Sequence, residues 1–429
     1  MYMIKSFKKI CISLFIILSL TLAFIPIVQA NEENSPSIYS PAAILMDLNS
    51  GKILYEKNIY TKMYPASLTK VMTAIIVLEN CELNDIATVS YESVMSLSSG
   101  YVTANLQIGE ELTVEQLLYV LMVGSSNDAA IVLAEHISGS VEEFSKLMNE
   151  KAKELGCTST NFINPNGVHD ETHYSTAYDL ALIAKYAMQN ETFRTLVSTT
   201  SYTLPTTNKY DKEDRAFQNT NALLQYSNNQ RADNYYYKYA TGIKTGFTTP
   251  AKNCLVASAD KDGLKFLTVV LGAGQTDEGL SQRYLDTINL FEYGYDTYSW
   301  VEIIKSGGVV HTTNIKNATR DTKKLDAVVG KDISALIKQE DKNNTILPEV
   351  TLNENLKAPI KKGDVIGSVK YTVEGIDYTA DLLANNDVKK SRAFIRFIEI
   401  LFLLLLCWLY LKSKQRKAKN RRLKTRVIR

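Results

Sequence analysis

In the N-terminal part of the chain, apolar residues alternate between short continuous runs and longer runs with helical spacing. Two short runs, Ala42–Met46 and Lys52–Tyr55, lie on either side of a stretch of turn residues and predict a β-hairpin. A run with helical spacing follows at Val71–Leu78, and we expect this helix to open at Ser67. Strands and helices in alternation predict a mixed α/β domain.

Further elements of this domain are indicated by capping residues and by later apolar runs. Thr113 with Gln116, and Ser140 with Glu143, each fit a capping box, in which two side chains three residues apart satisfy the first amides of a helix. The later runs predict two strands and a final helix, at Cys254–Ser258, Leu264–Val270 and Gln282–Tyr293.

The pattern changes near Ser299, where short runs rich in Thr, Val and Ile begin to alternate with Gly, Asn and Asp. Short strands joined by tight turns are typical of a small β domain. We therefore expect a main α/β domain over residues 31–298, a small all-β domain over residues 299–385 and a polar linker over residues 386–392.

The N-terminus has the pattern of a secretory signal peptide. Three lysines precede the apolar run Ile10–Ile27, and the segment ends at Ala30, a small residue suited to cleavage, before a polar stretch. We interpret residues 1–30 as a signal peptide rather than a retained anchor, so the rest of the chain is expected to be exported.

A second apolar run, Phe397–Leu411, is interrupted only by Glu399 and is followed by ten Lys and Arg residues among residues 412–429. This is the pattern of a stop-transfer segment. A bilayer span needs about 20 residues, so the span must reach back to about Ala393. We expect a transmembrane anchor over residues 393–411 and a basic cytoplasmic tail over residues 412–429.

An interfacial amphipathic helix is the rival interpretation of the same segment. Ile400–Leu411 has no polar face, which favours a span. Arg396 and Glu399 lie one helical turn apart and can pair. The sequence therefore predicts a single-pass protein of the cell membrane with its main domain outside the cell.

The charge of the chain agrees with this topology once it is divided by segment. The formal net charge is +2, but the part expected to be exported holds about 34 basic and about 45 acidic residues. An acidic exported part gives no electrostatic support to nucleic-acid binding. The basic tail suits anionic lipid at the inner leaflet instead.

Three cysteines, Cys81, Cys157 and Cys254, lie outside the signal peptide and the anchor. An odd number argues against a disulfide framework. The chain contains no Cys-x-x-Cys pair, so this pattern of a structural zinc site is missing.

Three short motifs point to acyl transfer on a serine, and their order and spacing matter more than any single match. Ser-x-x-Lys also occurs at Ser6–Lys9 and Ser-x-Asn at Ser159–Asn161, so each motif alone is weak. The three motifs are Ser67-Leu68-Thr69-Lys70, Ser125-Ser126-Asn127 and Lys244-Thr245-Gly246.

The first motif supplies a nucleophile and its base. A serine hydroxyl needs a base within hydrogen-bond reach, and residues three apart on a helix share a face, so Ser67 Oγ and the Lys70 amine are expected to meet. Lysine acts as a base only when it is neutral. Its pKa must therefore be lowered by burial or by a nearby positive charge such as Lys244.

With the residues around these motifs, the chain resembles the penicillin-recognising serine enzymes. It is most similar to the low-molecular-mass penicillin-binding proteins that act as D-alanyl-D-alanine carboxypeptidases. The resemblance covers about Ala42 to Tyr295 and, more weakly, Lys357–Gly363. It implies an α/β (α+β) serine β-lactamase/transpeptidase-like domain, followed by the small all-β domain and the C-terminal membrane helix. Further support comes from Asn164–Gly167, Tyr174–Ala177 and Phe247-Thr248.

The resemblance also implies roles for individual residues. Ser67 attacks the bond between the two terminal D-alanines of a peptidoglycan stem peptide, Lys70 takes its proton, and Ser125 relays a proton to the leaving D-alanine. Asn127 holds the peptide backbone of the substrate, and no cofactor or metal takes part. The resemblance implies that substrate binding also involves Lys244, Thr245, Gly246, Phe247 and Arg283. The backbone N–H groups of Ser67 and Phe247 are expected to form the oxyanion hole. Arg283 is expected near the substrate carboxylate.

Phe247 departs from the pattern of some carboxypeptidases of this kind, which have histidine directly after Lys-Thr-Gly. A backbone N–H is available whatever the side chain, so the oxyanion hole is not affected. We expect the difference to act on substrate preference.

A zinc pair is the competing interpretation of His169 and His173, which lie four residues apart. The segment follows Pro165-Asn166-Gly167, which predicts a loop rather than the helix that such a pair needs. We expect a loop beside the serine site.

The sequence leaves three functions open. The leading one is a carboxypeptidase that faces the cell wall and is acylated by β-lactam antibiotics at Ser67. A DD-endopeptidase or a β-lactamase on the same scaffold is the second, although no Glu-x-x-Leu-Asn segment of the class A β-lactamases lies between the second and third motifs. A non-catalytic cell-wall binding protein is the third, and the intact motif residues argue against it.

Overall fold

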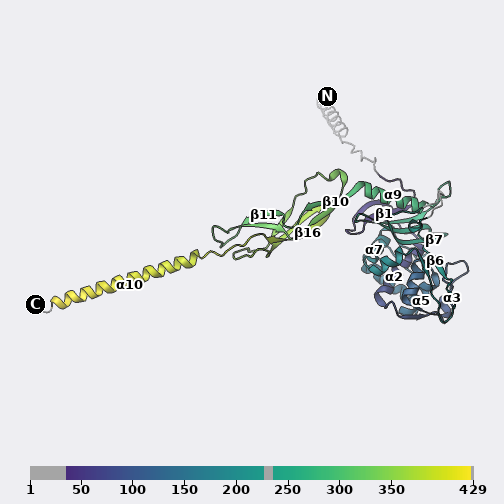
Figure 1. Ribbon diagram of the computed structural model, residues 1–429, viewed down its shortest axis with the longest axis horizontal. Helices are drawn as coiled ribbons and strands as arrows, with labels where there is room; N and C mark the ends of the chain where they lie inside the picture. The colour runs from purple at the N-terminus through teal and green to yellow at the C-terminus, as the bar shows by residue number, and fades with distance from the viewer. Residues whose placement is uncertain (1–34, 227–234, 427–429) are drawn as a thin grey trace, which may run out of the picture.

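The computed structural model describes residues 35–226 and 235–426. Figure 1 shows three parts in succession: a domain of strands and helices, a smaller domain of strands, and the long helix α10 (Ala393–Arg426), which extends away from both. The predicted signal peptide, residues 1–30, lies outside the described residues.

A five-stranded antiparallel sheet with the order β2-β1-β9-β8-β7 forms the centre of the first domain. Its strands have apolar residues on both faces. Ile44 and Met46 pack into one core cluster, whereas Ala43 and Leu45 pack into another, as the period of two along a strand requires. The strands are β1 (Ala42–Asp47), β2 (Ile53–Lys57), β7 (Ala240–Thr248), β8 (Lys252–Lys261) and β9 (Leu264–Ala273).

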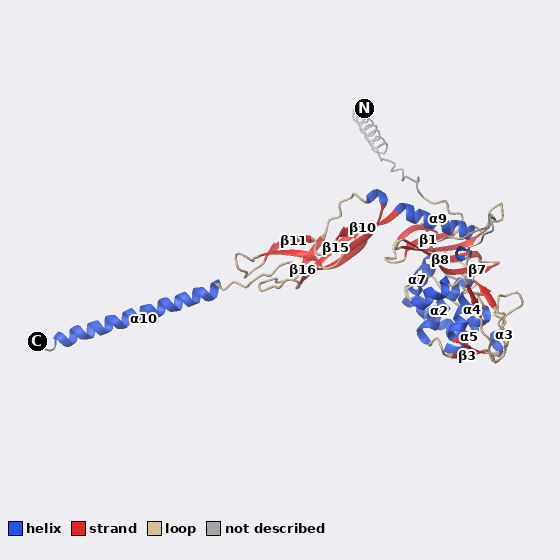
Figure 2. Cartoon of the chain, in the orientation of Figure 1, coloured by secondary structure: helices blue, strands red, loops and turns tan. Residues whose placement is uncertain are grey.

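Helices cover both faces of this sheet (Figure 2). One face packs against α9 (Gln282–Thr297), and the other packs against a group of helices that includes α7. The group contains α2 (Lys70–Asn80), α4 (Val114–Met122), α5 (Asn127–Ser138), α6 (Val141–Glu154), α7 (Ala177–Ala187) and α8 (Glu191–Ser198).

The capping prediction at Thr113 is confirmed, because its side chain accepts from the Gln116 N–H and the Gln116 side chain accepts from the Thr113 N–H. At Ser140 the structure has one of the two hydrogen bonds of a capping box, in which the Glu143 backbone N–H donates to Ser140 Oγ. Shorter elements complete the domain: η2 (Ala66–Thr69), β3 (Ile86–Thr88), α3 (Tyr91–Met95), β4 (Glu111–Thr113), β5 (Ser201–Thr203), β6 (Ala216–Gln218) and η3 (Ala222–Leu224).

The second domain consists of strands and one short 3₁₀ turn, as the sequence predicts. A five-stranded sheet of order β11-β12-β16-β15-β14 lies beside the pair β10 and β13. Its apolar core includes Leu325, Val369 and Leu382. The elements are β10 (Tyr298–Ile304), β11 (Val309–Asn314), β12 (Lys324–Val329), β13 (Ile333–Lys338), η4 (Gln339–Asp341), β14 (Glu349–Leu352), β15 (Val365–Val373) and β16 (Ile376–Ala384).

Lys52 connects the two domains. Its Nζ lies 2.7 Å from a Glu374 carboxylate oxygen and donates to the Leu336 carbonyl at 3.3 Å. The ammonium also lies over the Tyr298 ring, 5.2 Å from the centroid. The Lys52 side chain is almost fully buried, and a buried charge needs a partner. Its pairing with Glu374 therefore joins the β1–β2 hairpin to the β domain.

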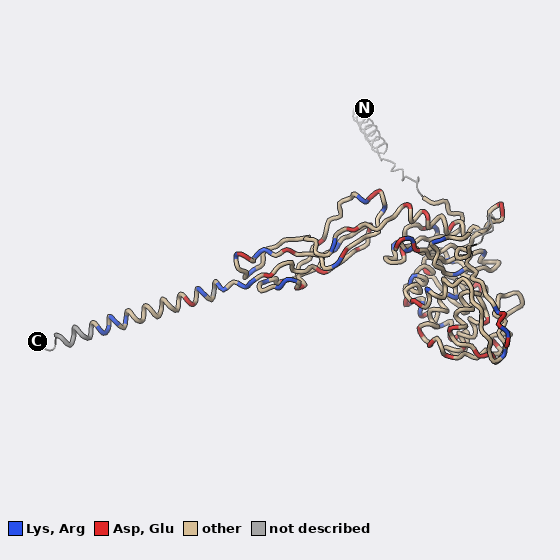
Figure 3. Tube along the Cα trace, viewed as in Figure 1, with Lys and Arg blue, Asp and Glu red and all other residues tan. Residues whose placement is uncertain are grey.

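The helix α10 begins at Ala393, and its large apolar side chains from Ile395 to Leu411 are exposed. In Figure 3, basic residues lie at both ends of this apolar stretch. Among the residues that the structure describes, none of the helices combines the length and apolarity needed to cross a bilayer.

Candidate active site

Ser67 lies in the 3₁₀ turn η2, and α2 begins only at Lys70. The expectation that an α-helix opens at Ser67 is therefore wrong in detail. In a 3₁₀ turn the residues i and i+3 are eclipsed, so Ser67 and Lys70 face the same side even more closely than in an α-helix. Ala66, directly before Ser67, has φ 48°, a left-handed conformation that non-glycine residues rarely adopt.

The Lys70 amine is fully buried and lies among three oxygen atoms. Its Nζ is 3.1 Å from Ser67 Oγ, 2.8 Å from Asn127 Oδ1 and 2.7 Å from the Asn166 carbonyl oxygen. Burial, followed by the positive charge of Lys244, holds the Lys70 pKa well below the usual lysine value. A neutral amine donates to the two carbonyl oxygens and accepts the Ser67 hydroxyl proton on its lone pair.

Asn127 is the first residue of α5, and it connects Lys70 to the neighbouring loop. Its Nδ2 donates to the Val102 carbonyl at 2.9 Å, and its backbone N–H donates to the same oxygen. Ser125, two residues earlier, is nearly buried and has φ 61°. Strained backbone of this kind costs about 1–3 kcal/mol and is common at functional sites.

The Lys-Thr-Gly motif lies on β7, an edge strand of the central sheet. A Cβ on Gly246 would lie 3.3 Å from the Ser67 backbone nitrogen, so this strand runs directly beside the nucleophile turn. The buried Lys244 Nζ donates to the Thr245 carbonyl at 3.2 Å and lies 3.4 Å from Thr220 Oγ1. Burial, followed by the charge of Arg283, lowers the Lys244 pKa to about 7.

Arg283, on the first turn of α9, contacts the same strand from behind. Its guanidinium donates to the Gly246 carbonyl oxygen at 3.2 Å and to the Tyr284 hydroxyl at 3.2 Å. Thr245 Oγ1 lies 2.6 Å from Thr220 Oγ1. The Phe247 side chain is 62% exposed and stands at the rim of the site.

Several residues that position this site have no role that the sequence predicts. Asn166 supplies a backbone carbonyl to Lys70, and Thr220 joins Lys244 and Thr245. The Asp128 carboxylate accepts the backbone N–H groups of Ala104 and Leu106 and so holds the loop that contains Val102. Carbonyls and supporting hydroxyls of this kind have no recognisable spacing along a chain.

His173 supports the nucleophile turn. The Ile163 N–H donates to His173 Nδ1 at 3.1 Å, so the ring proton is on Nε2, which donates to Thr69 Oγ1 at 2.8 Å. Both ring nitrogens are therefore used in hydrogen bonds. His169 lies elsewhere in the loop, edge-on to Tyr64 with ring centroids 4.6 Å apart.

Two family models match this chain. The model described as D-alanyl-D-alanine carboxypeptidase matches residues 29–275, which include the three motifs. The chain belongs to the D-alanyl-D-alanine carboxypeptidase family. The model described as penicillin-binding protein 5, C-terminal domain, matches residues 298–390, which form the β domain of this family member.

Relatives of this carboxypeptidase-family chain extend over both domains. The D-alanyl-D-alanine carboxypeptidase DacF of Bacillus subtilis (strain 168) is 33% identical over 361 residues, 83% of this chain and 88% of its own length. The carboxypeptidase DacC of Escherichia coli (strain K12) is 31% identical over 82% of this chain and 85% of its own length. The solved structure of penicillin binding protein 5 from Haemophilus influenzae has a TM-score of 0.63 at 29% identity and covers 83% of this chain and 99% of that one.

We predict that Gly167→Ala disrupts the site. A Cβ at Gly167 would lie 1.9 Å from the Ala66 carbonyl oxygen, and its φ of +78° already disfavours a side chain. We expect a loss of roughly 3–5 kcal/mol in unfolding free energy, measured by urea denaturation, and a loss of penicillin labelling.

Gly139→Ala is the matched control, because Gly139 has the same φ of +78° and no atom of the described residues lies within 4 Å of the added Cβ. It should cost only about 1–2 kcal/mol. Equal losses for the two variants would show that backbone conformation, rather than contact with the nucleophile turn, explains the effect.

His173 predicts a pH dependence of stability. Burial lowers its pKa to about 4, below the usual value of 6.5. Between these values the unfolded chain binds the proton more tightly than the folded chain does, so stability falls as the pH falls from about 6.5 to about 4. We expect this histidine to account for a loss of up to about 3 kcal/mol in unfolding free energy.

The measurement compares urea denaturation of the native protein and of His173→Gln at pH 7, 5 and 4. The variant should lose less stability on acidification, while the exposed-histidine control His311→Gln should follow the native protein. Parallel curves for all three proteins would contradict the assignment.

Proposed function

We propose that this protein is a serine D-alanyl-D-alanine carboxypeptidase, which removes the terminal D-alanine from peptidoglycan stem peptides through an acyl-enzyme on Ser67. The observation that supports it best is the Lys70 amine, which is buried, depressed in pKa and 3.1 Å from Ser67 Oγ. Membership of the carboxypeptidase family agrees with this chemistry.

In the first step, Ser67 Oγ forms a bond to the carbonyl carbon of the penultimate D-alanine while its proton moves to Lys70 Nζ. The two carbonyl oxygens around Nζ stabilise the ammonium that results. We assign the oxyanion hole to the backbone N–H groups of Ser67 and Phe247, because Gly246 brings its strand against the Ser67 nitrogen.

In the second step, the tetrahedral intermediate breaks its C–N bond and D-alanine leaves with a proton that Ser125 relays. Asn127 holds the substrate amide while its Oδ1 accepts from Lys70. Water then adds to the Ser67 ester and releases the shortened peptide. The proton that leaves with D-alanine is the one that Lys70 took from Ser67, so Lys70 is neutral again when it takes a proton from the attacking water.

We assign recognition of the terminal carboxylate to the Lys244, Thr245 and Arg283 side of the site. Thr245 and Lys244 share Thr220 as a partner, and Arg283 adds positive charge behind the strand. The edge position of β7 suits an extended peptide, which adds to a sheet through backbone hydrogen bonds. The exposed Phe247 ring is then placed to act on substrate preference.

A β-lactam has a strained amide that imitates the same bond, so it should acylate Ser67 and leave slowly. Native protein should bind a fluorescent penicillin and release D-alanine from a short peptide ending in D-Ala-D-Ala. Ser67→Ala should lose both, and Lys70→Ala should lower the acylation rate by about 10²–10⁴-fold. Ser201→Ala, at an exposed serine of β5, is the control and should retain both.

Labelling without release of D-alanine would favour the endopeptidase alternative, which a cross-linked peptide dimer tests directly. Rapid turnover of the penicillin would favour a β-lactamase. Absence of labelling at Ser67 would contradict the acyl-enzyme itself and favour a non-catalytic cell-wall binding protein.

We further propose that residues 1–30 direct export and that the apolar part of α10 attaches the protein to the membrane, with the main domain facing the cell wall. The apolar side chains of α10 are exposed rather than packed against the β domain, and the segment ends in basic residues such as Lys412 and Lys414. An anchor of this kind holds the active site at a set distance from the lipid.

Membrane fractionation of expressing cells tests this attachment. The full chain should sediment with membranes, resist alkaline carbonate and dissolve in detergent, and its N-terminus should be Asn31. A chain ending at Arg392 should be released as a folded protein that still binds penicillin. Release of the full chain by carbonate would favour the interfacial helix, and a full chain in the soluble fraction would contradict the attachment.

A further inference from the structure

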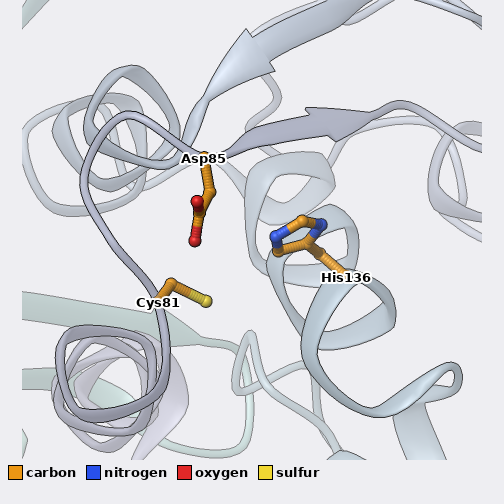
Figure 4. A group of neighbouring side chains, drawn as sticks. All are labelled: Cys81, Asp85 and His136. Atoms are coloured by element: carbon orange, nitrogen blue, oxygen red, sulfur yellow. The ribbon is translucent and has the colours of Figure 1, made fainter.

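Three metal-ligating side chains meet at the end of the helical group opposite the active site (Figure 4). Cys81 is the C-cap of α2, His136 lies in the last turn of α5, and Asp85 lies in the loop before β3. Figure 4 shows the three side chains pointing toward one space from three separate elements. Their ligand atoms all lie within 4.8 Å of one another.

This set of donors suits one kind of ion. A thiolate, an imidazole and a carboxylate together are typical ligands of zinc, which binds them at about 2.0–2.3 Å with tetrahedral geometry. Two ligand atoms of such an ion lie about 3.5 Å apart, so small side-chain rotations close the observed spacing. Three protein ligands leave the fourth position for water.

The backbone around the group also favours a cation. Two helices end here, and the C-terminal end of a helix has a partial negative charge from its free carbonyl groups. The last turn of α2 has no basic residue, and His136 is the basic residue in the last turn of α5. The Glu82 N–H donates to the Asp85 carboxylate at 2.9 Å and orients it, as an outer partner of a metal ligand does.

We propose that Cys81, Asp85 and His136 form a zinc-binding site. The ion would join the far ends of the two helices whose first residues, Lys70 and Asn127, are hydrogen-bonded in the active site. The length of α2 places the ion roughly 16 Å from Lys70. Its role is therefore to stabilise the helix pair and not to contact the substrate.

Zinc needs the thiolate, so binding releases the Cys81 proton. Zinc and a proton then compete for the same sulfur.

The experiment uses the full chain in detergent, freed of metal by a chelator and kept reduced with a phosphine. Zinc titrated against a chromophoric chelator should bind with one equivalent per chain. Cys81→Ser and His136→Gln should each weaken binding by at least about 10–100-fold. Cobalt(II) in place of zinc should give a sulfur-to-cobalt absorption band that Cys81→Ser lacks.

His311→Gln is the matched control, because His311 is an exposed histidine on β11 in the other domain. It should bind zinc like the native protein. Saturating zinc should raise the unfolding temperature of the native protein and of this control by roughly 5 °C, with little effect on Cys81→Ser. Circular dichroism of each variant establishes that it is folded.

Two results would overturn the proposal. Native protein that binds no zinc at one equivalent rules the site out. Native protein and Cys81→Ser with the same zinc affinity show that the ion binds elsewhere. Both results are independent of the peptidase activity, so they leave the proposed function unaffected.

Discussion

The arrangement of the active site depends on the burial of one amine. Lys70 has no exposed surface, and its nearest partners are two carbonyl oxygens and the Ser67 hydroxyl. Burying an unpaired ammonium costs several kcal/mol, so the folded protein favours the neutral amine. A neutral amine beside a serine is the base that acyl transfer requires. The same burial therefore creates both the chemistry and a cost that the surrounding structure must offset.

Close backbone packing offsets that cost by fixing the three segments that meet at Lys70. Gly167 leaves room for the Ala66 carbonyl, and Gly246 brings β7 to the Ser67 nitrogen. His173 holds Thr69 from the other side through its neutral ring. Small changes at the two glycines act directly on the turn that holds Ser67, because the neighbouring atoms there belong to the backbone and cannot rotate away. A zinc ion at Cys81 would act on the same helices from their other ends.

The sequence was sufficient for the residues whose side chains define motifs. Ser67, Lys70, Asn127 and Lys244 are recognisable because they stand in motifs of fixed residue type and spacing, and the structure brings these residues together. The short apolar runs also identified the sheet strands β1, β2, β8 and β9. The boundary between η2 and α2 was not predicted, because 3₁₀ and α-helical turns have the same apolar spacing over four residues.

Other features depend on contacts between distant segments, and no local pattern records them. The Asn166 carbonyl and the Thr220 hydroxyl are such cases, and so are Cys81, Asp85 and His136, which the fold brings together from separate elements. These three residues form no Cys-x-x-Cys pattern along the chain, so no sequence motif marks them.

The pH dependence of Ser67 acylation tests the central claim, that Lys70 is a neutral base at neutral pH. We expect the rate of penicillin acylation to be lost at acid pH with a midpoint well below 10.5, the ordinary lysine value. Lys244→Gln removes the nearby positive charge and should move that midpoint upward. A rate that continues to rise until the pH reaches about 10, in both proteins, would contradict the account.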